Sequence, residues 1–198
     1  MFSTTVPAAD PSRSPVINLI HAVFRASPYA SCQPAFLSSL LPLYKGTLST
    51  PDRQILSLFQ LFEAHRKLSI ASLFTAWSAS GVIESQKPLD ALLSLDANKV
   101  FETCVAFPLR RSLRSDGKEK SESEFEFTQG IYDPAFVLPL FNVVLEEHLS
   151  GLDWVDLLRL NVLGIAVCSL SSRDGEMRAV GRNVLTKAME LITVRTTL

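Results

Sequence analysis

The chain contains 198 residues, a usual length for one domain and enough to bury a core without disulfides or metals. Its 19 lysines and arginines nearly balance 20 aspartates and glutamates, so the net charge of −1 excludes a strongly basic nucleic-acid binder and an acidic solvating tail. Hydrophobic residues make up 47% and charged residues 20%, which is typical of an ordered globular protein.

Helix start signals recur along the chain, and strand signals are nearly absent. Residues 1–14 are rich in proline and serine, and we expect a flexible leader there. Ser14 and Pro15 then open a first helix, because a proline at the first helical position loses no hydrogen bond. Caps and apolar residues at helical spacing predict further helices at 34–44, from 50 onward, at 69–80 and from 96 to before 108.

Residues 110–130 interrupt this pattern with charges, serines and an Asp-Gly pair, so we expect an exposed loop. The loop holds the densest basic stretch of the chain, which is a candidate contact for RNA phosphates or a partner, because clustered basic residues release counterions. Its members are Arg110, Arg111, Arg114, Lys118 and Lys120. Acidic residues from Asp116 to Glu126 oppose this interpretation, and a solvated loop is the alternative.

The last third of the chain predicts three successive helices. Asp133 and Pro134 start the first, which runs towards Leu149 and contains Pro139, expected to kink it or leave one carbonyl without its donor. The second is expected as one continuous helix over 152–170, apolar on nearly all sides, and the third follows a turn at 171–174. We expect the second helix to pack on the third through a set of aliphatic side chains: Val162, Ile165 and Val167 on one, and Val180, Val184 and Ala188 on the other.

These helix pairs resemble HEAT or armadillo repeats. A pair with a very apolar first helix and a short Ser/Asp turn cannot bury its own apolar face, so it must stack on its neighbours. The sequence therefore predicts an all-α fold, an irregular α-solenoid of antiparallel helix pairs over residues 15–198 in a single domain. No strict period runs through the chain, and a compact helical bundle is the alternative.

The sequence offers no residue for catalysis or cofactor binding. Its three histidines, at 21, 65 and 148, have no acidic partner at a metal-ligand spacing, and its three cysteines, at 32, 104 and 168, are too far apart in sequence for a zinc motif. Nucleotide-binding glycine motifs and a hydrolase elbow are absent. No apolar run reaches the length of a membrane span. We therefore expect a non-enzymatic protein without cofactor, membrane or small-molecule substrate.

Two segments resemble a known family. The sequences GIYDPAFVLPL at 130–140 and LSSRDGEMRA at 170–179 are similar to the carboxy-terminal region of the nucleolar pre-ribosomal-associated protein 1 family, whose members are large helical-repeat scaffolds. The motif residues are Tyr132, Asp133, Pro134, Phe136 and Arg178, for which the resemblance implies structural roles.

This resemblance implies a function in early assembly of the large ribosomal subunit. The expected setting is the nucleolus, in pre-60S particles, with assembly factors that include a DEAD-box RNA helicase and with precursor rRNA as a candidate partner. The alternatives are a generic HEAT or armadillo adaptor in transport or signalling, which shares every feature except the Y-D-P-x-F-x-L-P element, and a helical enzyme without a recognisable motif.

Overall fold

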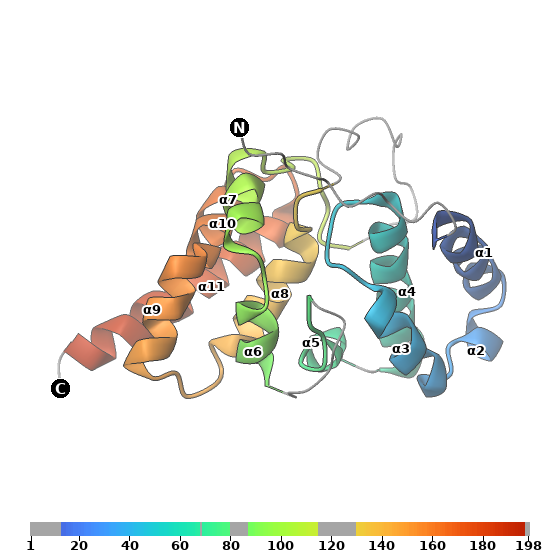
Figure 1. The fold of residues 1–198 in the computed structure, drawn as a ribbon, viewed down its shortest axis with the longest axis horizontal. Helices are drawn as coiled ribbons and strands as arrows, with labels where there is room; N and C mark the ends of the chain where they lie inside the picture. Colours follow the sequence, from blue (N-terminus) through green and yellow to red (C-terminus); the bar gives the residue numbers. More distant parts are fainter. Residues whose placement is uncertain (1–12, 68, 80–86, 115–129, 197–198) are drawn as a thin grey trace, which may run out of the picture.

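The computed structural model describes residues 13–67, 69–79, 87–114 and 130–196, and these residues form helices joined by short connections (Figure 1). The first half contains α1 (Arg13–Ala26), α2 (Pro28–Ser31), α3 (Pro34–Leu40), a 3-10 turn (Leu41–Leu43), α4 (Thr50–Arg66) and α5 (Ile70–Phe74). The second half contains α6 (Pro88–Leu93), α7 (Ala97–Val105), α8 (Pro134–Val144), α9 (Gly151–Leu160), α10 (Val162–Ser169) and α11 (Gly175–Thr196). The predicted all-α fold is confirmed, since the described residues contain no strand beyond an isolated bridge between Thr47 and Tyr132.

Helix α8 lies in the middle of the molecule. Helices α1 to α4 are on one side of it, and α7 and α9 to α11 are on the other (Figure 1). It contacts α5, α6, α10 and α11, and nearly all of its side chains are buried, because it is apolar all round. Stacking of antiparallel helix pairs into a solenoid stays a prediction.

The expected continuous helix over 152–170 is wrong, because the chain breaks at Asn161 between α9 and α10. Asn161 has a φ of 60°, a left-handed conformation that asparagine tolerates better than most residues. Its backbone N–H donates to the Leu158 carbonyl and closes α9. The break places Val162 and Ile165 in the core, where both are completely buried, whereas Val167 is 55% exposed, contrary to expectation. The expected packing of α10 on α11 is confirmed.

Four other helix boundaries differ from the prediction. The helix expected to run towards Leu149 ends at Val144. The described part of the first helix already includes Arg13 and Ser14 of the expected leader, and the Arg13 guanidinium pairs with the Asp52 carboxylate; residues 1–12 lie outside the described part. The helix that starts at Pro34 changes to a 3-10 turn after Leu40, because Pro42 has no N–H to continue it. The helix expected over 69–80 ends at Phe74, where two tight turns follow.

The described helices include none that is both long and apolar enough to cross a membrane.

Candidate functional site

The Tyr132-Asp133-Pro134 motif lies where the two halves of the protein meet. Asp133 is the N-cap of α8, and its Oδ1 accepts a hydrogen bond from the Ala135 N–H at 2.9 Å, with Pro134 in the first turn. The Tyr132 hydroxyl accepts from the Asp96 N–H at 3.0 Å, so it ties the start of α7 to the start of α8. The motif is thus a structural junction between the two halves.

A buried ion pair holds this junction. The Nε and Nη2 atoms of Arg111 both donate to the Asp133 carboxylate, at 3.1 Å and 2.8 Å, and the two side chains are 3% and 0% exposed. The Asp133 backbone N–H donates to the Gly46 carbonyl at 2.8 Å. Asp133 therefore joins α8, the segment that follows α7, and the loop before α4.

Phe136 anchors the same junction through aromatic contacts. Its ring lies 4.7 Å from the rings of Phe74 and Trp77 and 5.2 Å from that of Tyr44, all measured between centroids. Gly46 passes so close that a Cβ atom there would lie 2.7 Å from the Phe136 ring, and its φ of 71° also favours glycine. Phe136 is thus a core residue, and no other role is left for its completely buried side chain.

Asp52 forms a second buried acidic hub that the sequence did not reveal. From the sequence it is an aspartate in the first turn of a helix, near the positive end of α4. In the structure its carboxylate accepts hydrogen bonds from the N–H groups of Lys45 and Thr47, at 3.2 Å and 3.0 Å, as well as from the Thr47 hydroxyl and Arg13. The only local signal was an aspartate in the first turn of a helix, which does not indicate contacts with the preceding loop.

The structure separates the basic residues that sequence reasoning grouped. Arg110 and Arg114 are exposed, whereas Arg111 is buried against Asp133 and does not belong to a surface arm. Arg114 lies 3.7 Å from the Glu176 carboxylate, in an exposed pair. Arg178, from the second motif, donates to the Ser172 carbonyl at 2.7 Å and closes the turn before α11. Lys118 and Lys120, like most of the predicted loop, lie outside the described residues.

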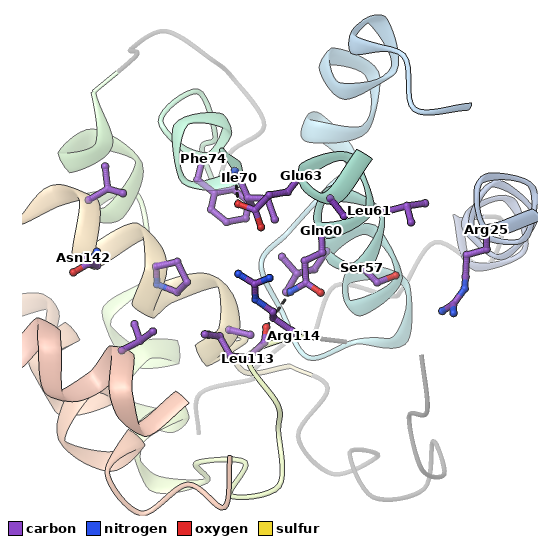
Figure 2. A pocket seen from close by; sticks show the side chains of 16 residues that line it. Arg25, Ser57, Gln60, Leu61, Glu63, Ile70, Phe74, Leu113, Arg114 and Asn142 are labelled. Carbon is purple, nitrogen blue, oxygen red and sulfur yellow. Dashed lines mark hydrogen bonds between the residues drawn. The ribbon is translucent and has the colours of Figure 1, made fainter. Parts of the chain in front are cut away.

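A groove of about 850 Å³ crosses α4, from α1 on one side to α8 on the other (Figure 2). Most of its lining is aliphatic, and these aliphatic side chains are called its floor below. Polar side chains complete the lining. The lining residues used below are Arg25, Leu56, Gln60, Leu61, Glu63, Ala64, Ile70, Phe74, Leu113, Arg114, Ala135, Pro139, Val143 and Val180. In Figure 2 the guanidinium of Arg114 and the carboxylate of Glu63 both project into the space between α4 and α8.

Two polar contacts fix the shape of the groove. The Gln60 side-chain amide donates to the Leu113 carbonyl at 2.9 Å, so it attaches the segment before Arg114 to α4. The Glu63 carboxylate accepts from the Ile70 N–H at 3.4 Å and holds the first turn of α5 against α4 (Figure 2). Gln60 and Glu63 therefore hold neighbouring segments of the groove in place.

A serine and a histidine meet near the groove, but their geometry does not suit a nucleophile. The His21 Nε2 and Ser57 Oγ atoms lie 2.9 Å apart, and the Ser57 hydroxyl also donates to the Gln54 carbonyl at 2.9 Å. The single hydroxyl proton of Ser57 can go to the Gln54 carbonyl, and with the proton there His21 is the donor to Ser57 and not its base. No group of three metal-ligating side chains occurs among the described residues.

Two of the three cysteines are poor nucleophiles as well. Cys104 and Cys168 lie on neighbouring helices, and the Cys168 thiol donates to the Cys104 carbonyl at 3.5 Å. Burial, reinforced by Cys168, raises the pKa of Cys104 from 9.0 to about 11. Burial also raises the pKa of Cys32. Because the thiolate is the reactive form, these two thiols are poor nucleophiles near neutral pH.

Comparison with known proteins identifies relatives of this chain. It is 28% identical over 212 aligned residues to human nucleolar pre-ribosomal-associated protein 1, an alignment that covers 93% of this chain and 9% of the human protein. It is 30% identical over 189 residues to the mouse protein of the same name, covering 86% of this chain and 8% of the relative. The chain thus spans less than a tenth of the length of these relatives. No protein-family model matches it, and no solved structure matches it.

Proposed function

Because the chain belongs to the family of nucleolar pre-ribosomal-associated protein 1, we propose that it is a non-enzymatic helical scaffold domain of ribosome assembly in the nucleolus. The observation that carries this proposal is similarity to two pre-ribosomal proteins along about nine tenths of the chain. The site supports it, because the motif residues build a junction and the groove presents no activated nucleophile. We therefore infer that the domain acts by presenting binding surfaces to other molecules.

At a finer level, the proposed setting is the pre-60S particle. The partners would be assembly factors of the large subunit, including a DEAD-box RNA helicase, and precursor rRNA is a further candidate. Contact with rRNA would depend on the exposed Arg110 and Arg114, and on Lys118 and Lys120 of the following segment. Arg111 has no part in this contact, because its charge is buried against Asp133.

Sedimentation of tagged chain from growing eukaryotic cells tests the proposal. We expect the chain to migrate with pre-60S particles and to co-purify with precursor rRNA and large-subunit assembly factors. Its absence from these fractions, together with recovery of transport cargo or kinases, would instead establish the generic HEAT or armadillo adaptor.

Crosslinking separates RNA contact from protein contact. If RNA is touched directly, the double variant Arg110→Glu/Arg114→Glu should lose crosslinks to precursor rRNA, whereas Arg182→Glu, an exposed arginine on α11, should keep them. Unchanged crosslinking in the double variant would refute a role for these two arginines.

A further inference from the structure

We propose that the groove over α4 binds an acidic segment of a partner protein that also carries bulky apolar side chains. This inference deepens the proposed function, on which it rests, because it names the chemistry by which an assembly factor would be recognised. A volume of about 850 Å³ is within the range of roughly 300–1,000 Å³ that is usual for binding pockets.

The floor of the groove accounts for the apolar part of the ligand. It is formed by aliphatic side chains from α4, α5, α8 and α11 and from the segment before Arg114: Leu56, Leu61, Ile70, Leu113, Pro139, Val143 and Val180. Several of these side chains are only half-buried, so a bulky apolar side chain placed there would remove apolar surface of both molecules from water.

The wall formed by α8 adds a hydrogen-bond acceptor. Pro139 has no N–H, so the Ala135 carbonyl one turn earlier lacks the donor that an α-helix normally provides. Both residues line the groove. A backbone N–H of a bound segment that reached the Ala135 carbonyl would replace the donor that Pro139 lacks.

Charge decides which segment fits. Arg25, in the last turn of α1, and Arg114 are both exposed and line opposite parts of the groove. Among the described lining residues the single acid is Glu63, whose carboxylate accepts a hydrogen bond from the N–H of Ile70. The described lining thus carries two arginines against one carboxylate, and Arg114 also lies in an exposed pair with Glu176 that an acidic ligand would replace. This net positive charge complements acidic side chains.

The same lining disfavours RNA as the occupant. Bases bind to proteins by stacking on accessible aromatic or guanidinium planes, and phosphates need several basic groups along one track. In the part of the groove that the structure describes, the only aromatic residue is Phe74, which is completely buried, and the two arginines are separated by the aliphatic floor. A protein segment fits this surface better.

Selection from a displayed library of random peptides on the purified 198-residue chain tests this inference. We expect enriched peptides to combine Asp or Glu with bulky apolar residues. Ala64→Trp would place an indole in the groove from an exposed position and should weaken their binding by about tenfold or more. Ala97→Trp, at an exposed position of α7 outside the groove, is the matched control.

Charge reversal provides the second arm of the test. Arg114→Glu should shift the enriched peptides from acidic to basic, and Arg182→Glu should leave the preference unchanged. Absence of enrichment, binding that survives Ala64→Trp, or displacement of the peptides by single-stranded RNA would each overturn the inference. So would binding that appears only after residues 115–129 are shortened, since the groove would then be filled by the chain itself. None of these results depends on sedimentation with pre-60S particles, so the two proposals can fail separately.

Discussion

Replacing Arg111 with methionine should be among the most damaging single substitutions in this protein. Methionine fills a similar volume, but it removes every hydrogen bond that Arg111 makes to Asp133. The aspartate side chain is completely buried, and its remaining donor is the Ala135 N–H. The substitution therefore leaves a carboxylate in the interior without a counter-charge.

The expected cost is about 3–5 kcal/mol, which is usual when one partner of a buried ion pair is removed. A domain of this kind has about 5–15 kcal/mol of stability in total, so the variant should keep only part of it. An exposed pair such as Arg114 with Glu176 contributes far less, on the order of 0–1 kcal/mol. The burial of the Arg111 pair is the reason for the difference.

Urea titration of the purified variants, followed by helical circular dichroism, measures this cost. Arg182→Met is the matched control and should change the free energy of unfolding by no more than about 0.5 kcal/mol, because Arg182 is exposed. The double variant Arg111→Met/Asp133→Asn should recover part of the loss, because a neutral amide is cheaper to bury than an unpaired carboxylate. If Arg111→Met and Arg182→Met were equally stable, the ion pair would not hold the junction.

Three further substitutions or reactions probe other parts of the fold. Ile165→Asp should cost about 3 kcal/mol or more in the same titration, because it places a carboxylate in a completely buried position of α10; a loss as small as that of a surface variant would mean that the helix faces are wrong. Gly181→Ala should cost about 1–3 kcal/mol, because its Cβ atom would lie 1.8 Å from the Ser169 Oγ, and an unchanged unfolding midpoint would contradict that contact. Alkylation of Cys104 should be slow near neutral pH and accelerate towards pH 11, because the thiol has a pKa of about 11 in the folded protein and 9.0 in the unfolded one. Equal alkylation rates of the folded and denatured protein, measured by mass spectrometry, would refute this prediction.

Local signals predicted a large part of the fold. Asp96 and Asp133 cap α7 and α8, and a proline follows the second of them, because capping depends on residues only a few positions apart. The break at Asn161 was not predicted, because it consists of one residue in the left-handed conformation. The apolar pattern continues on both sides of that residue, as it would in an unbroken helix. The starts of α8 and α11 were therefore visible in the sequence, but the end of α8 at Val144 and the turn between α9 and α10 were not.

The candidate site was less predictable, because its parts are distant in sequence. Arg111 stands in a basic stretch, and only the fold shows that its partner is Asp133, 22 residues later. The groove is lined by residues of α1, α4, α5, α8 and α11, so no single segment of the sequence indicates that it exists. Arg114 was correctly expected at the surface, but its position beside an aliphatic floor could not be inferred from its neighbours in the chain.

The two buried acids give the groove its rigidity, although neither of them lines it. Residues 44–49 lead into α4, and Asp52 of that helix binds the N–H groups of Lys45 and Thr47. The same loop accepts the Asp133 N–H through Gly46, so the N-terminal ends of α4 and α8 are fastened to one short segment. These two helices are the walls of the groove, and Arg111 stabilises the fastening by pairing with Asp133. A preformed groove loses less conformational entropy when a ligand binds, so we expect the junction to raise the affinity of the proposed binding surface.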